Sequence, residues 1–260
     1  MENTQRILES VTRKWWFILL FILLQFIPAY ASKGFDPSKM GEIIGYVLGH
    51  SIMSLIDFLY PVFKVIPILL VFSIVFLDNR VTRWFSVYVG VSYVLFAFLQ
   101  SVAVTEEYGL SVVTSNLVMF LIVAVFWFWE AVVQKNDFSP QKLSAWKYWV
   151  VPFAFLAFWY PANPLTLMPD FNLIYLLTNG AGLAFCMMTP VYLTIFTLYY
   201  PRVNVGTFRV TSIAGTIIGF YNVLVNFFMV PSVLWWNGVL HIPLIAISVY
   251  GLILSFKWAS

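Results

Sequence analysis

The chain has 260 residues, of which 62% are hydrophobic and only 10% are charged, and its mean hydropathy is +0.89. Soluble domains carry about 25% charged residues, so this composition excludes a soluble domain and predicts an integral, multi-pass protein of the cell membrane. The net charge of +3 comes from basic residues scattered between apolar runs, which excludes a nucleic-acid-binding patch. A single cysteine, Cys186, excludes an intrachain disulfide and a cysteine metal cluster, and we expect neither a metal nor a cofactor.

Long apolar runs predict an all-α bundle of about eight transmembrane helices, each near 20 residues long. The predicted spans are residues 15–31, 55–77, 84–103, 110–133, 147–163, 171–200, 207–230 and 234–256. The first run imitates a secretory signal that ends in A-x-A at 29–31, but we interpret it as a retained span. Residues 41–54 are predicted to form an outer-surface helix, or a tilted extension of the second span.

The distribution of charge predicts the orientation. With one crossing between residues 41 and 77, the basic residues outside the spans lie on one side, except for Lys33 and Lys39. The acidic Glu106, Glu107 and Asp170 lie on the same side as these two lysines. The positive-inside rule then places both termini in the cytoplasm.

Two parts of the sequence resemble each other and predict an internal duplication. RKWWFILLFILLQFIPAY (13–30) aligns with WKYWVVPFAFLAFWYPAN (146–163) at an offset of 133 residues. Pro61 aligns with Pro190, and RVT at 80–82 aligns with RVT at 209–211, both at an offset of 129. We predict one membrane domain, 1–260, built from repeats at approximately 13–134 and 146–257. An even number of spans in each half gives parallel four-helix repeats about an axis along the membrane normal.

Polar side chains that the two halves do not share mark the candidate site. In the second half these are Asn179, Asn222, Asn226, Asn237 and His241, on three predicted spans. Because polar groups that face lipid are costly, we expect the three stripes to converge on a polar interior. The alternative is ordinary helix packing, which also uses asparagine and small residues.

The first half carries its own polar stripe in HSIMSLIDFLYPVFK (50–64), where His50, Asp57 and Lys64 follow one another at helical spacing. One interpretation is an ion pathway in which Asp57 or His50 couples protons to transport. The other places His50 and Asp57 in water at the outer surface and lets Lys64 extend outward along its stem. Glu130, near the end of the fourth span, is interpreted as an interfacial anchor.

The leading functional hypothesis is transport or permeation of a small molecule or ion through a polar site between the two repeats. The lipid bilayer and a small-molecule or ion ligand are the expected partners. One alternative is a membrane-embedded enzyme that acts on a lipid or isoprenoid, with Asp57 or Glu130 as a proton donor. Another is a non-catalytic subunit that assembles with itself or with a larger membrane complex. A haem held by His50 and His241, the two histidines of the chain, is the remaining alternative.

Overall fold

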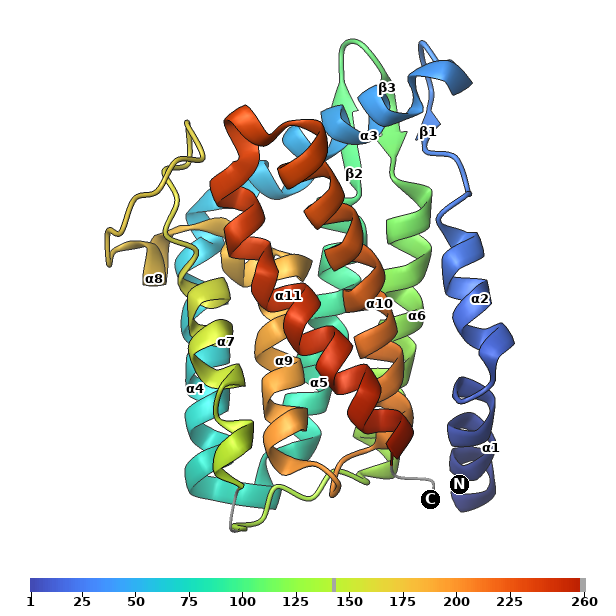
Figure 1. Ribbon diagram of the computed structural model, residues 1–260, viewed down its shortest axis with the longest axis vertical. Coiled ribbons are helices and arrows are strands. Elements are labelled where there is room, and N and C mark those ends of the chain that lie inside the picture. The colour runs from blue at the N-terminus through green and yellow to red at the C-terminus, as the bar shows by residue number, and fades with distance from the viewer. Residues whose placement is uncertain (142–143, 258–260) are drawn as a thin grey trace.

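The computed structural model describes residues 1–141 and 144–257, which form a bundle of helices with a small sheet at one end (Figure 1). In chain order the helices are α1 (Glu2–Thr12), α2 (Trp15–Leu24), α3 (Met40–Gly49), α4 (Tyr60–Leu77), α5 (Thr82–Leu95), α6 (Thr114–Val133), α7 (Val150–Trp159), α8 (Tyr175–Thr178), α9 (Phe185–Tyr199), α10 (Val205–Leu224) and α11 (Pro231–Lys257). The strands are β1 (Tyr30–Ala31), β2 (Val102–Thr105) and β3 (Gly109–Val112). Short 3-10 helices include Ile52–Leu59 and Gly180–Leu183, and π-helical turns follow α5 at Phe96–Gln100 and α10 at Val225–Met229.

Five helical stretches in the described part of the chain are long and apolar enough to cross a membrane. They are Pro37–Arg80, Thr82–Gln100, Thr114–Val133, Val205–Met229 and Pro231–Lys257. The pair Tyr175–Leu183 and Phe185–Tyr199, bent by 93°, makes a sixth if it is one broken span. The apolar α2 has only 10 residues. The helical membrane bundle is therefore supported, whereas the finer count of about eight spans stays a prediction.

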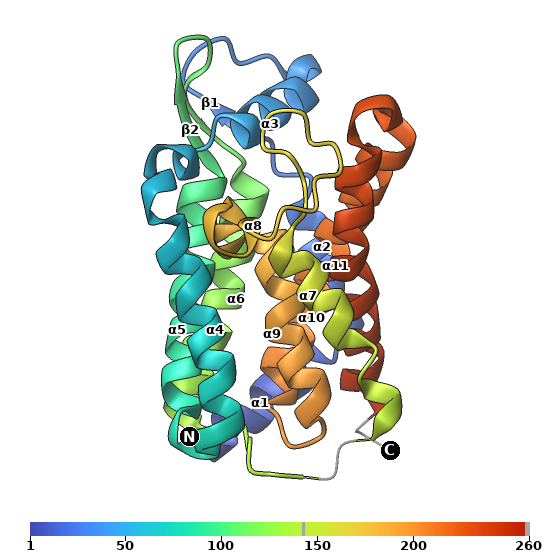
Figure 2. The same cartoon turned by 90° about the vertical axis from the view of Figure 1, so that its left-hand side faces the viewer.

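The start of α1 and the end of α11 lie at the same end of the bundle, opposite the sheet (Figures 1 and 2). The chain between them passes along the bundle in alternating directions. Helix α9 lies in the middle of this arrangement, between α5 and α11 (Figure 1). This topology keeps the basic loops predicted to be cytoplasmic at the end that holds α1.

A three-stranded antiparallel sheet with the order β1–β3–β2 departs from the predicted all-α fold. Val102 pairs with Val112, and Thr105 pairs with Gly109 across the hairpin turn. Gly109 has φ of +62°, a conformation that glycine adopts without strain. The predicted spans 84–103 and 110–133 include parts of β2 and β3, because apolar β-branched runs resemble span ends when they are judged by hydropathy alone.

Helix α3 packs over this sheet and covers the end of the bundle (Figure 1). Its Ile43 and Val47 are buried against Ala103, Tyr108 and Val113. The amphipathic spacing of Ile43 and Val47, one helical turn apart, explains why α3 lies flat on the strands.

The helix expected across residues 50–64 is interrupted. Helix α3 ends at Gly49, and Ile52–Leu59 is a 3-10 helix with a non-helical Ile56 at φ −118° and ψ 28°. His50, Asp57 and Lys64 therefore do not share one α-helical face, in contrast to the prediction from their spacing.

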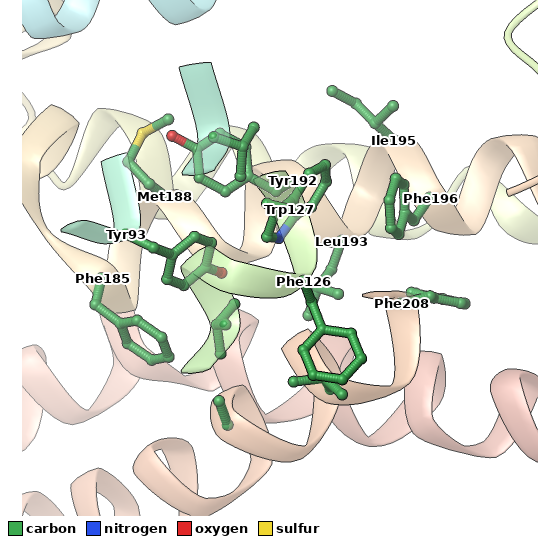
Figure 3. Close-up of a cluster of buried hydrophobic side chains, with 14 of the residues drawn as sticks. Tyr93, Phe126, Trp127, Phe185, Met188, Tyr192, Leu193, Ile195, Phe196 and Phe208 are labelled. Carbon is green, nitrogen blue, oxygen red and sulfur yellow. The ribbon is translucent and has the colours of Figure 1, made fainter. Parts of the chain in front are cut away.

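The core of the bundle is aromatic. Trp127 of α6 stacks on Phe196 of α9, with ring centroids 4.7 Å apart, and Tyr192 packs against its edge (Figure 3). Two of the polar tips inside this core are paired: Trp127 Nε1 donates to Thr211 at 3.1 Å, and Tyr93 shares a hydrogen bond of 2.9 Å with Thr189 of α9. These rings hold α9 against α5 and α6, so the middle of the bundle is filled.

Helices α10 and α11 approach closely at Gly215 and Gly219, which are spaced as a GxxxG pair. A Cβ atom on Gly219 would lie only 2.9 Å from Cβ and 3.0 Å from Cα of Ile245. The missing side chain thus lets the two backbones come together, as small residues do between membrane helices.

The two π-helical turns stand at equivalent places in the predicted duplication. Phe96 and Val225 begin them, and Gln100 and Met229 end them, so both bounds differ by 129 residues. This is the offset at which the sequence aligns with itself. The coincidence favours the duplication, and the repeats themselves stay a prediction.

Candidate functional site

The candidate site is centred on the C-terminal end of α7. This helix has 10 residues and stops short of the upper ends of α10 and α11 (Figure 1). The last carbonyl groups of a helix need partners from outside the helix. Lys64 of α4 donates to the carbonyl of Phe158, and the side-chain amide of Asn179 donates to the carbonyls of Trp159 and Tyr160 at 2.9 and 3.1 Å. Side chains from two other parts of the chain therefore satisfy this helix end.

A set of hydrogen-bonded side chains continues from the end of α7 into α10 and α11. We call Tyr160, Cys186, Asn222, Asn226, Asn237 and His241 the amide cluster. The Tyr160 hydroxyl donates to Asn237 Oδ1 at 2.7 Å, and Asn237 Nδ2 donates to Asn226 Oδ1 at 2.9 Å. Asn226 Nδ2 in turn donates to the backbone carbonyl of Asn222 at 2.7 Å. The cluster thus links three helices through amide groups.

His241 and Cys186 complete the cluster at its edges. His241 Nδ1 lies 2.7 Å from the carbonyl of Asn237, and the ring is buried. Because a carbonyl oxygen only accepts hydrogen bonds, Nδ1 carries the hydrogen, and Nε2 of the neutral ring is left as an acceptor. Asn222 Nδ2 lies 3.7 Å from the sulfur of Cys186 on α9. The cluster therefore reaches α9 as well.

The π-helical turn after α10 places Asn226 in the cluster. The amide of Val230 bonds to the carbonyl of Val225 at 3.0 Å, which is the i to i−5 pattern of a widened turn. The widened turn brings the Asn226 side chain, which is 2% exposed, to the carbonyl of Asn222. Such turns are often found at functional sites.

A second interrupted helix faces the same region. The segment Tyr175–Leu183 meets α9 at 93°, and α9 begins at Phe185, whose amide donates to Gln100 Oε1 at 2.8 Å. Gln100 belongs to the π-helical turn after α5. The C-terminal end of α7 and the N-terminal end of α9 are therefore both satisfied by amide side chains rather than by a continuing helix.

The structure brings some predicted site residues together and leaves others apart. The amide cluster contains four of them, namely Asn222, Asn226, Asn237 and His241, whereas Asn179 and Lys64 reach the cluster through the end of α7.

His50 and Asp57 are exposed and lie outside the amide cluster. His50 stacks on Tyr46, with ring centroids 4.2 Å apart. Lys64 is 0% exposed, so the interpretation that it extends outward to water is wrong.

A polar network at the opposite end of the bundle escaped the sequence interpretation. Glu130, interpreted as an interfacial anchor, is 0% exposed. Its carboxylate accepts from the backbone amide of Asn136 at 2.7 Å and from Asn204 Nδ2 at 2.6 Å. Gln5 of α1 donates to Asn204 Oδ1 at 2.9 Å. We call Gln5, Glu130, Asn136 and Asn204 the α1 hub.

The hub, together with Arg209, docks α1 on α6 and α10. Arg209 donates to the carbonyl of Glu9 at 3.0 Å and to Thr12 Oγ1 at 2.9 Å, and Trp129 donates to Gln5 Oε1 at 2.6 Å. One signal of this network was present in the sequence, because Asn204 precedes an apolar helix as N-cap residues do. The pairing of Gln5 with Asn204, 199 residues apart, carried no such signal.

The carboxylate of Asp137, in the loop after α6, is expected to make the stability of the fold depend on pH. The pKa of Asp137 is lowered from 3.8 to about 2, because the Ser139 hydroxyl and the Asn79 amide donate to its carboxylate. A folded-state pKa below the unfolded one stabilises the fold above about pH 4, and this contribution is lost as the pH falls towards 2. We expect Asp137→Asn to lower the unfolding temperature at pH 7, and the difference from the natural protein to shrink between about pH 4 and pH 2. A difference that is the same at every pH would contradict this assignment.

No family model, no curated protein and no solved structure matches this chain.

Proposed function

We propose that this chain is a multi-pass protein of the cell membrane that transports or conducts a small molecule or ion through the region of the amide cluster. A single observation carries the proposal. The end of α7 and the break between Tyr175–Leu183 and α9 meet one hydrogen-bonded set of polar side chains, the amide cluster. Interrupted helices within a bilayer are tolerated where they face protein or a polar cavity, and transporters use them to build substrate sites. Asn226 is the central residue, because it joins α11 to α10.

Two further features support this proposal. The matching offset of the π-helical turns favours parallel repeats at 13–134 and 146–257, which is a common transporter architecture. The end of α7, in the second half, is held by Lys64 of the first half. The proposed pathway therefore lies where the two halves meet, with both termini in the cytoplasm.

The test is uptake by the full-length protein in proteoliposomes. The panel contains labelled neutral amino acids, sugars, small carboxylates and alkali cations. We expect Asn226→Leu to reduce uptake of the transported solute by about tenfold or more, because leaving its polar partners unpaired costs about 1–3 kcal/mol. Asn3→Leu makes the same chemical change at an exposed position of α1 and is expected to leave uptake unchanged.

Two results would contradict the proposal. If the natural protein takes up no member of the panel, transport of these solutes is excluded. If Asn226→Leu and Asn3→Leu transport equally well, the pathway does not pass the amide cluster. Protein yield and the elution profile on size exclusion must match between the two variants, so that a folding defect is not mistaken for a loss of transport.

A further inference from the structure

Lys64 is a fully buried amine that has no carboxylate partner in the part of the chain that the structure describes. Its side chain is 0% exposed, and Nζ donates to the carbonyl of Phe158 while lying 4.3 Å from the centroid of the Phe158 ring. No ion pair within residues 1–141 and 144–257 joins Lys64 to a carboxylate. Asp57, seven residues before it in the chain, is exposed.

The contacts of Lys64 compensate only part of the cost of burying its charge. Removing an ammonium group from water is costly even after the protein relaxes. The carbonyl end of a helix and a cation–π contact each return only part of that cost. An ammonium group also has three N–H donors, and the Phe158 carbonyl takes one of them. The site therefore has both charge and donors left for an anion.

The surroundings of Lys64 contain the break in the sixth candidate span. The turn Gly180–Leu183 lies directly on α4, because a Cβ atom on Gly182 would be 2.3 Å from the Phe63 carbonyl oxygen and 3.1 Å from the Lys64 amide. Asn179, one residue before this turn, offers its amide to the carbonyls next to Phe158. The Lys64 amine and the Asn179 amide thus meet at one helix end, where the turn Gly180–Leu183 packs on α4.

We propose that Lys64 binds the carboxylate of the transported solute, so that the substrate class is a small organic carboxylate. The inference rests on the proposed transport function. The carboxylate takes the N–H donors of Lys64 that Phe158 does not use, beside the helix end whose next two carbonyls are held by Asn179. The turn Gly180–Leu183 packs on the backbone of α4 at Phe63 and Lys64, next to this position.

The test is thermal unfolding of the purified full-length protein with pairs of matched ligands. Acetate, succinate and benzoate are each compared with their amides at equal ionic strength, and oleate serves as a lipid-derived carboxylate. We expect at least one carboxylate to raise the unfolding temperature by about 5 °C at saturation, and its amide to have no effect. A shift with oleate alone assigns the site to a lipid carboxylate, and a shift with a short acid assigns it to a water-soluble one.

The variant Lys64→Met decides the role of the amine. Methionine keeps an unbranched apolar stem and removes the desolvation cost of a buried charge that no ion pair compensates. We expect Lys64→Met to lose the carboxylate shift and Lys64→Arg to retain part of it. An unchanged shift in Lys64→Met, or no shift with any carboxylate in the natural protein, would overturn the proposal.

A measurement on the natural protein covers the case in which Lys64→Met does not fold. Reductive methylation is followed at Lys64 by mass spectrometry. The active carboxylate must slow this modification and its amide must not, whereas equal rates would overturn the assignment.

The outcomes separate this inference from the proposed function. Uptake of a neutral solute that depends on Asn226, with no carboxylate shift, overturns the substrate class and leaves transport standing. A carboxylate shift that requires Lys64, with no uptake of any solute, leaves the binding site standing and overturns transport.

Discussion

Asn204→Ala is expected to lower the free energy of unfolding by about 3 kcal/mol or more, the largest effect of any single polar substitution considered in this protein. Asn204 caps α10 by accepting from the amides of Gly206 and Thr207 at 3.1 and 3.3 Å. It also donates to the buried carboxylate of Glu130 and accepts from Gln5. Alanine removes the cap and leaves a buried carboxylate with one partner fewer, and the two losses add because they concern different groups.

The chain offers a matched control for this prediction. Asn163 accepts from the amides of Leu165 and Thr166 at 2.9 and 3.1 Å, in the same local geometry, but its turn is exposed. Asn163→Ala should therefore cost at most about 1 kcal/mol. Both variants are unfolded by heat and by SDS in mixed micelles. Equal losses in Asn204→Ala and Asn163→Ala would show that only the cap matters and that the α1 hub contributes nothing.

Gly182→Ala is expected to destabilise the protein by about 2–3 kcal/mol, near the upper end of the usual cost of overpacking. The new Cβ atom would lie 2.3 Å from the Phe63 carbonyl oxygen and 2.7 Å from its carbon. Both are backbone atoms of α4, so no side chain can rotate away. The turn Gly180–Leu183 must therefore lift off α4 at Phe63 and Lys64.

Gly45→Ala is the control for Gly182→Ala. Gly45 lies inside α3, and a Cβ atom there would meet nothing within 4 Å. Alanine is the better helix former by about 1 kcal/mol, so Gly45→Ala should be neutral or stabilising. Thermal unfolding of the two variants checks this pair, and a neutral Gly182→Ala would show that the turn is not seated on α4 as described.

Much of the fold and part of the candidate site could be predicted from local sequence. Apolar runs identified the helices that can cross a membrane, because hydropathy depends on composition alone. The spacing of Asn222, Asn226, Asn237 and His241 placed each of them on one side of its helix. The cost of facing lipid with an amide then indicated that these sides would meet, and they form the amide cluster.

Other features depended on contacts that sequence spacing does not encode. The β2–β3 hairpin lies where hydropathy predicts the ends of two spans, and backbone pairing rather than hydropathy decides between strand and helix there. His50 and Asp57 lie on the same stripe as Lys64 in the sequence, yet only Lys64 is buried, because the 3-10 helix Ile52–Leu59 ends the regular spacing.

The sequence by itself determined the class of this protein and the polar side chains available for chemistry, because both follow from composition and from helical period. Only the tertiary structure decided which of these side chains lie together and which are sealed from water. The end of α7 is held by Lys64 and Asn179, and α1 is held by Asn204 and Glu130, across separations of 20 to 199 residues. The physical reason is that hydrogen bonds and burial act through space. A carbonyl group without a partner in its own helix accepts from a donor that packing brings near it, however distant that donor is in the sequence.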